Sequence, residues 1–168
     1  ADRPFFGVVG YTATHSPWEG NPERLVAPYR DAVSVPAEST YSFGAPSNEG
    51  VAAQDWNRNA RETRAQYCAA VEGIDTQAGR VLDELDRQGL REETLVVYTA
   101  DHGLNLGEHD VWGKGNATRP ANALEESVRV PLVWNGPGVR AGQTRREFVD
   151  HCDTFAALLD YADIDPPA

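Results

Sequence analysis

The stretch Thr94-Leu95-Val96-Val97-Tyr98-Thr99-Ala100-Asp101-His102-Gly103 decides the fold of this chain. Its first part is apolar and β-branched, which predicts a buried central strand. Its last part is polar, so this strand delivers Asp101 and His102 at its C-terminal end. Upstream, apolar residues between Asp55 and Gln88 recur at spacings of three and four, which predicts an amphipathic helix that ends at Gly89. A helix, a short turn, a strand and a polar tip make an α/β unit.

Further elements extend this unit in both directions. The apolar run from Phe5 to Tyr11 predicts a second buried strand, the run from Val128 to Trp134 predicts a third, and Asp153 is expected to cap a helix that reaches Tyr161. Residues 16–48 show no period, which predicts a long surface segment with little regular structure. The covering segment from Glu19 to Val51 is expected to help shape a pocket, since loops over strand ends carry specificity. The alternation predicts a single domain over residues 1–168, an α/β sandwich with a largely parallel central sheet.

The composition excludes several classes of partner. With 26 acidic and 15 basic residues, the chain has a net charge of -11, which repels polyanions and excludes general binding of nucleic acid or acidic lipid. The chain has no apolar run of about 18 residues that could span a bilayer. It opens at Ala1 and contains no methionine, so we expect a mature, cleaved or truncated piece. Cys68 and Cys152 are expected to be buried thiols in helices, rather than a disulfide or a zinc site.

Asp101 and His102 are the first candidates for chemistry. A carboxylate and an imidazole that follow an apolar strand can be aimed by a turn at one point, and both groups are common metal ligands. The alternative is that Asp101 caps the following turn and that His102 is an ordinary surface histidine. Their wider context favours the metal site.

The segment from Tyr98 to Gly115 resembles the metal-binding stretch of the sulfatase family, which belongs to the alkaline-phosphatase-like superfamily. Other segments resemble that family in the same order along the chain: Phe5 to Trp18, Tyr67 to Asp75, Glu125 to Leu132, and Asp153 to Leu159. The resemblance therefore spans nearly the whole chain. It implies an alkaline-phosphatase-like sandwich, incomplete because its N-terminal part is absent, and a parent enzyme that hydrolyses sulfate esters of carbohydrates, phenols or alkyl alcohols.

The same resemblance implies roles for individual residues. Asp101 and His102 match metal ligands, with calcium as the implied ion. The imidazole of His102 also suits softer ions such as zinc or manganese, so the residues leave the metal open. Lys114, the chain's single lysine, matches a lysine that contacts the sulfate group. His15 matches a histidine that contacts sulfate or the leaving oxygen. These roles suit sulfuryl transfer, in which charge develops on the equatorial oxygens and on the leaving group.

Each of these residues also has an ordinary structural explanation. His15 would merely cap the loop before Pro17, and Lys114 would be a solvated loop lysine. His109 is a further candidate for facing the substrate, with a surface position as its alternative. Its neighbours Glu108 and Asp110 are expected to be solvated.

One part of the family pattern has no counterpart here. Sulfatases of this kind oxidise a cysteine or serine in a Cys/Ser-x-Pro/Ala-x-Arg motif to formylglycine, beside two further acidic metal ligands. Neither Cys68 nor Cys152 lies in such a motif, and Ser34-Val35-Pro36-Ala37-Glu38 ends in glutamate instead of arginine. We therefore expect weak metal binding by the chain alone, with the nucleophile and the other ligands coming from a missing N-terminal segment or from another chain.

Two other functions compete with sulfate ester hydrolysis. A phosphodiesterase or phosphatase of the same superfamily would use related chemistry, but such enzymes often place a second histidine where this chain has Leu104. A non-catalytic remnant or partner-binding module would explain the missing nucleophile. The resemblance implies a soluble protein that is secreted or periplasmic, whereas the residues themselves leave the compartment open.

Overall fold

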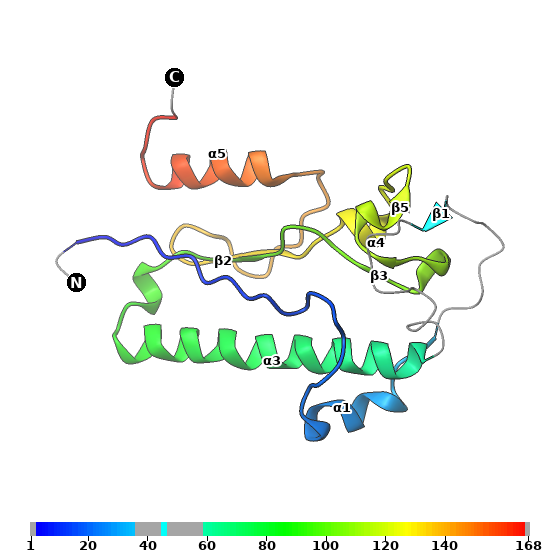
Figure 1. The fold of residues 1–168 in the computed structure, drawn as a ribbon. Coiled ribbons are helices and arrows are strands. Elements are labelled where there is room, and N and C mark those ends of the chain that lie inside the picture. The colour runs from blue at the N-terminus through cyan, green and yellow to red at the C-terminus, as the bar shows by residue number, and fades with distance from the viewer. Residues whose placement is uncertain (1–2, 36–44, 47–58, 167–168) are drawn as a thin grey trace. The chain divides into compact units, whose positions relative to one another are not determined.

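A computed structural model describes residues 3–35, 45–46 and 59–166 of the chain (Figure 1). The chain divides into two compact units, Ala1–Pro137 and Gly138–Ala168. The first unit contains all the predicted site residues. The second holds one described helix, α5 (His151–Tyr161). The single domain expected over residues 1–168 remains a prediction.

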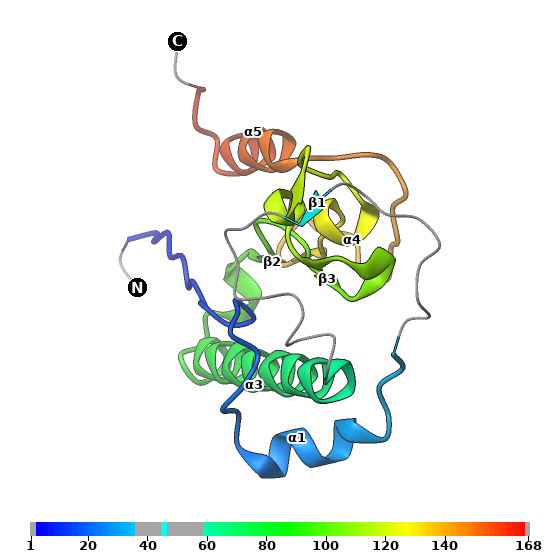
Figure 2. The same cartoon turned by 45° about the vertical axis from the view of Figure 1, so that its right-hand side comes forward.

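Two helices form one layer of the first unit. α3 (Ala60–Arg87) confirms the predicted amphipathic helix from residue 60 onward, while residues 55–58 lie outside the described part. Helix α1 (Glu23–Arg30) packs on it, as Figure 2 shows from a second direction. Small Ala65 and Ala69, one turn apart on α3, let Val26 of α1 approach closely, and all three side chains are buried. This helix corrects the expectation of little regular structure for residues 23–30, while residues 36–44 and 47–48 of that predicted segment lie outside the described part.

α3 ends as its sequence predicts. Gly89 has a φ of +66°, in the left-handed region that favours glycine. The amide of Leu90 bonds the carbonyl of Leu85, and the amide of Gly89 bonds that of Asp86, which is the double closure of a Schellman motif. The short 3-10 turn η1 (Arg91–Glu93) then leads into β2 (Val96–Thr99), which confirms a strand at this place. Its predicted buried, central position is not observed, because Val96 and Val97 are half-buried, Tyr98 and Thr99 are exposed, and β2 has one neighbour among the described strands.

All pairings of the described strands are antiparallel. β2 pairs with β6 (Leu132–Asn135), β3 (Asn105–Leu106) with β4 (Trp112–Gly113), and β1 (Ala45–Pro46) with β5 (Thr118–Arg119). The largely parallel sheet expected from the sequence is therefore not formed among these strands. The connection between β2 and β6 contains no long helix of the kind that usually links parallel strands, since α4 (Glu125–Val128) has only 4 residues.

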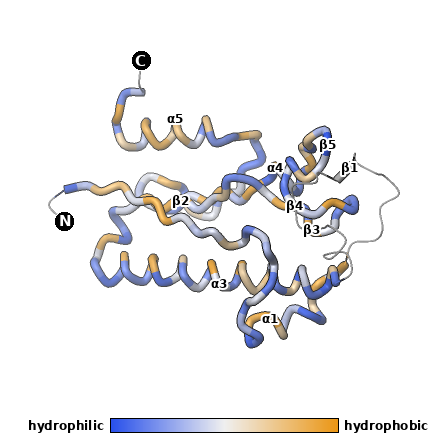
Figure 3. The backbone as a smooth tube through the Cα atoms, in the orientation of Figure 1, coloured by the Kyte–Doolittle hydropathy of each residue, from blue (hydrophilic) through white to orange (hydrophobic). Residues whose placement is uncertain are grey.

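The predicted strand from Phe5 to Tyr11 was wrong for the described structure. This segment is extended but pairs with no described strand, and its side chains are exposed, Phe6 by 81%. In Figure 3 much of it carries hydrophobic colours. An apolar run predicts burial only where a neighbouring surface is present to cover it.

Three smaller expectations also need correction. The predicted strand over residues 128–134 is shorter, because α4 continues to Val128 and β6 begins at Leu132. Helix α5 begins at His151, two residues before the expected cap, since Asp150 accepts from the amides of Cys152 and Asp153 in a capping box. Cys152 is exposed and Cys68 is half-buried, and both are free thiols. No helix among the described residues is long and apolar enough to cross a membrane.

A small aromatic core joins three parts of the first unit. Trp18 from the N-terminal segment, Leu106 from β3 and Trp112 from β4 are buried together, and Tyr67 of α3 packs against them. The two indole rings lie 6.1 Å apart at an interplanar angle of 45°. This contact fixes the segment that carries His15 against the hairpin that leads to Lys114.

Candidate functional site

Asp101 and His102 lie directly after β2, as the sequence predicts. The amide of His102 donates to Oδ1 of Asp101 over 3.0 Å, and Nε2 of His102 lies 3.6 Å from Oδ2 of the same carboxylate. The Asp101 side chain is 88% exposed and that of His102 is 32% exposed. One carboxylate oxygen and one imidazole nitrogen are thus presented side by side at an accessible strand end.

The proton on the His102 ring is placed by its surroundings. Nδ1 lies 2.9 Å from the carbonyl oxygen of Gly103, which can only accept a hydrogen bond. In the neutral ring the proton is therefore on Nδ1, and Nε2 keeps the lone pair that a metal would need. The Nδ1 bond also fixes the orientation of the ring.

The turn that carries this pair is held against α4. The amide of Gly103 donates to the carbonyl of Ser127 over 2.9 Å. A Cβ atom on Gly103 would lie 2.1 Å from the carbonyl oxygen of Glu126, so any side chain there would collide with the backbone. Glycine is therefore required at this position by close approach of two backbones.

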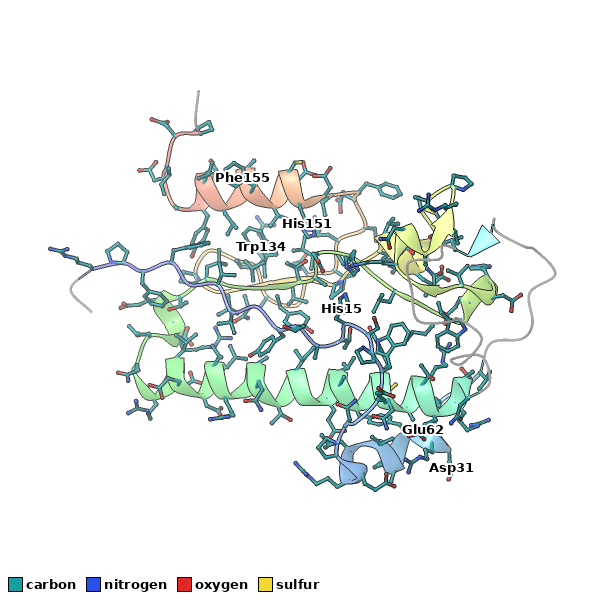
Figure 4. The ribbon with its side chains drawn as sticks, viewed as in Figure 1. His15, Asp31, Glu62, Trp134, His151 and Phe155 are labelled. Carbon is teal, nitrogen blue, oxygen red and sulfur yellow. The ribbon has the colours of Figure 1, made fainter. Side chains whose placement is uncertain are left out.

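His15 lies on the N-terminal segment that runs between α3 and β2, where Figure 4 labels it. Its Nδ1 lies 2.7 Å from the carbonyl of Ser16, and its backbone amide donates to Thr12. As in His102, this bond places the proton of the neutral ring on Nδ1 and leaves Nε2 as an acceptor, or as a donor once the ring is protonated. The His15 side chain is exposed and therefore open to a ligand.

Lys114 follows β4 and precedes the 3-10 turn η3 (Gly115–Ala117). Its carbonyl accepts from the amide of Ala117 over 2.8 Å. The residue is half-buried, yet no carboxylate among the described residues pairs with its ammonium group. A partly buried cation without an acidic partner favours binding of an anion.

His109 and Glu108 both have protein partners. Nε2 of His109 lies 3.7 Å from Oε1 of Glu126 in α4. Glu108 is paired with Arg64 of α3 over 2.8 Å and accepts from the amide of Leu106, so the expectation that it is solvated was wrong. Burial pushes the pKa of Glu108 upward, but the bonds from Leu106 and Arg64 outweigh it and hold the pKa below its ordinary value. Glu108 therefore supports the loop as an anion.

The structure brings some of the predicted residues together and leaves others without a direct link. Asp101 and His102 are adjacent, whereas no hydrogen bond or ion pair of the described residues joins His15 or Lys114 to them. The described residues contain no group of three or more His, Cys, Asp or Glu side chains that could hold a metal ion. The donor pair fits part of a coordination shell, since ligands at about 2.4 Å from calcium and at right angles are about 3.4 Å apart. This spacing is close to the 3.6 Å between Oδ2 and Nε2.

Sequence reasoning missed the polar residues buried beneath this loop. Asn105 is fully buried and Ser127 is 3% exposed, and each is hydrogen-bonded to the other. The signal was available, because Leu104-Asn105-Leu106 places an amide inside an apolar run. A buried amide needs partners, so such a pattern indicates a structured polar contact.

Comparisons of the sequence and of the structure with known proteins point to the same family. The family model described as Sulfatase matches residues 1–164. The chain is 32% identical to the multifunctional alkaline phosphatase superfamily protein PehA of Trinickia caryophylli, over 95% of this chain and 34% of that protein. Among solved structures, the putative sulfatase yidJ from Bacteroides fragilis is 25% identical with a TM-score of 0.65, over 88% of this chain and 30% of that one.

A second solved structure carries a ligand. BT4656 in complex with its substrate D-glucosamine-2-N,6-O-disulfate is 31% identical with a TM-score of 0.58, over 65% of this chain and 21% of that one. The chain thus spans 34% of PehA and smaller shares of the two solved proteins.

Proposed function

Because the chain belongs to the sulfatase family, we propose that its whole protein hydrolyses sulfate esters and that these residues supply part of the metal and sulfate site. The observation that carries the proposal is the Asp101 and His102 pair, with Oδ2 and Nε2 3.6 Å apart at an exposed strand end. Asp101 and His102 would hold a divalent cation, with calcium as the ion that the family resemblance implies. A bound cation would neutralise charge on the sulfuryl oxygens.

The other residues have roles that their surroundings support. The Lys114 ammonium would bind the sulfate oxygens, because no carboxylate of the described residues neutralises it. Once protonated, Nε2 of His15 would donate to the leaving oxygen, while Nδ1 keeps its bond to Ser16. His109, whose ring lies beside Glu126, would face the substrate. A formylglycine nucleophile and further acidic ligands would come from outside these 168 residues, which cover only 34% of a relative such as PehA.

Hydrolysis of 4-nitrophenyl sulfate tests this proposal. The full-length protein is assayed with calcium beside its Asp101→Ala variant and beside Asp83→Ala, a matched change at an exposed carboxylate on α3. We expect the Asp101 variant to lose about a hundredfold or more of kcat/KM and the Asp83 variant to keep its activity. The isolated chain should be inactive. Full activity in the Asp101 variant, or turnover by the isolated chain, would contradict the proposed site.

Phosphoester or phosphonate hydrolysis is the second candidate. It is favoured by the similarity to PehA, a relative described as a multifunctional member of the alkaline phosphatase superfamily. Sulfate and phosphate esters share a tetrahedral centre with charged oxygens, and the same cation and lysine would stabilise both. Parallel assays with 4-nitrophenyl phosphate and 4-nitrophenyl phenylphosphonate, which release the same 4-nitrophenol, decide between sulfate, phosphate and phosphonate esters, because the highest kcat/KM identifies the preferred ester.

A further inference from the structure

The backbone around Lys114 is held on both sides by amide side chains, those of the buried Asn105 and the half-buried Asn122. Nδ2 of Asn105 donates to the carbonyl of Gly113 over 3.2 Å. Asn122 bonds the carbonyl of Gly115 twice, through its backbone amide at 2.8 Å and through Nδ2 at 3.2 Å. The carbonyl of Lys114 itself accepts from Ala117. The carbonyls of Gly113, Lys114 and Gly115 are therefore all hydrogen-bonded, so the backbone that carries the lysine side chain has little conformational freedom.

Ser127 links these two amides to each other. Its Oγ accepts from Nδ2 of Asn105 over 2.6 Å and lies 2.9 Å from Oδ1 of Asn122, to which it donates. Nδ2 of Asn122 continues the series to Oγ1 of Thr118, which donates to the carbonyl of Pro120. Every bond runs in the same donor-to-acceptor direction, so each polarises the next.

The same serine also holds the Asp101 and His102 turn. Its backbone carbonyl accepts from the amide of Gly103, one residue after His102. Ser127 lies in α4, which Figures 1 and 2 both show beside β3. Ser127, which is 3% exposed, thus bonds the turn with its carbonyl. Its hydroxyl bonds the two amide side chains that hold the lysine loop.

We propose that Asn105, Ser127 and Asn122 form a positioning network that sets the Lys114 loop at a fixed place relative to the Asp101 and His102 turn. The inference rests on the proposed function, in which Lys114 binds the sulfate group and Asp101 and His102 bind the cation, so that the distance between them matters. None of the three residues is catalytic, because each acts on backbone groups that carry Lys114 or follow His102.

The orphaned oxygen of Asn105 supports a positioning purpose. Its Oδ1 is buried and has no hydrogen-bond partner among the described residues. Rotating the amide by half a turn would not help, because it would place an oxygen against the carbonyl of Gly113. A buried acceptor without a partner costs stability, so leucine would serve better if the position were needed only to fill the core.

Variants of the full-length protein test the network. Ser127→Ala removes the linking hydroxyl and Ser127→Thr retains it. Asn105→Leu removes the two hydrogen bonds that Nδ2 donates, to the Gly113 carbonyl and to Ser127 Oγ. It also removes the buried oxygen without a partner, which costs stability, so this variant is expected to fold even if Ser127→Ala does not. Thr76→Ala is the matched control, because it deletes a hydroxyl that bonds a backbone carbonyl on the exposed part of α3.

Two readouts separate positioning from a loss of folded protein. We expect Ser127→Ala and Asn105→Leu to raise KM for 4-nitrophenyl sulfate and Ki for inorganic sulfate about fivefold, the effect of one lost hydrogen bond, with Ser127→Thr close to wild type. Unfolding would instead lower kcat with KM unchanged. Hydrogen exchange should quicken at the amides of Ala117 and Asn122 in both variants, and it should not change in Thr76→Ala.

The outcomes distinguish this inference from the proposed function. Unchanged Ki and unchanged exchange in both network variants overturn the network. A wild-type protein that neither hydrolyses the ester nor binds sulfate overturns the proposed function. In that case the exchange rates at Ala117 and Asn122 still decide whether the network holds the loop.

Discussion

The ring nitrogens of His15 and His102 decide what each histidine can do. Both rings bond a backbone carbonyl through Nδ1, at 2.7 Å and 2.9 Å, so the reactive nitrogen in both is Nε2. Nε2 of His102 lies beside a carboxylate, whereas Nε2 of His15 has no acidic neighbour among the described residues. The first environment suits a metal ligand and the second suits a proton donor.

Replacing His102 should therefore weaken metal binding more than substrate binding. In His102→Ala we expect the calcium concentration for half-maximal activity to rise about tenfold or more, because one ligand is lost. Titration of the full-length enzyme with calcium measures this. His151→Ala, at the start of α5, is the matched control. An unchanged calcium requirement in His102→Ala would remove this residue from the metal site.

The two thiols should differ in reactivity. Burial raises the pKa of Cys68, only partly opposed by Arg64, while Cys152 is exposed. Since the thiolate is the reacting form, we expect Ellman's reagent to modify Cys152 quickly and Cys68 slowly at pH 8. Kinetics of the wild-type chain beside Cys152→Ser check this, and a single fast phase for both thiols would contradict it.

How far the sequence predicts single residues depends on how local their environment is. Asp101 and His102 were placed correctly because a β-branched run fixes where the strand ends. The local pattern around Asn105 indicates that its amide is buried, but it does not name the partner, because Ser127 lies far away along the chain. Glu108 is likewise bound by a distant residue, Arg64. A partner distant in sequence leaves no local pattern.

At the level of elements, α4 organises the site although it is only 4 residues long. It receives the Gly103 amide, holds His109 through Glu126 and carries Ser127. The sequence predicted a strand from Val128, and the local apolar pattern favoured it. Tertiary contacts to backbone groups outweighed that weak local preference.

Gly103→Ala tests how closely α4 must approach the turn. Its Cβ would lie 2.1 Å from the Glu126 carbonyl oxygen, and no flexible side chain is there to move aside. We expect a loss of about 2 kcal/mol or more in the free energy of unfolding, measured by urea denaturation. Gly79→Ala on α3, where a Cβ meets nothing within 4 Å, should be neutral or stabilising. Equal stability of the two variants would refute the close approach.

The Arg64–Glu108 pair should make the link between α3 and the hairpin depend on pH. The folded pKa of Glu108 lies below its ordinary value of 4.5, so its contribution is fully present above that value and is lost as the pH falls through the folded pKa. We expect Glu108→Gln to cost about 1 kcal/mol at pH 7 and progressively less toward pH 3. Arg87 also lowers the pKa of Glu84, but that pair is exposed and screened by solvent, so Glu84→Gln should show a smaller dependence on pH.

For the whole molecule, the sequence predicted the mixture of helices and strands and the family, but not the pairing of the strands. Strand direction depends on which segments meet, and β2 meets β6 through a connection without a long helix. The sequence also did not predict that the run from Phe5 to Tyr11 is exposed. Whether an apolar run is covered depends on the rest of the molecule.

The exposed apolar segment predicts the behaviour of the chain in solution. Phe5, Phe6, Val8 and Val9 are all more than half exposed. We expect the isolated chain to self-associate at micromolar concentration, and a Phe6→Ser/Val8→Ser variant to sediment closer to a monomer in analytical ultracentrifugation. Phe148→Ser, in the second unit, provides the matched control. Monomeric wild-type chain would contradict this expectation.

The contact between Trp18 and Trp112 gives the molecule an optical signal of its own. Two indoles 6.1 Å apart with tilted rings couple their excited states, so the pair should produce a paired positive and negative band in far-ultraviolet circular dichroism. One chromophore sits three residues after His15 and the other two residues before Lys114. The amplitude of that band therefore reports directly on whether these two regions are docked, without label, substrate or metal.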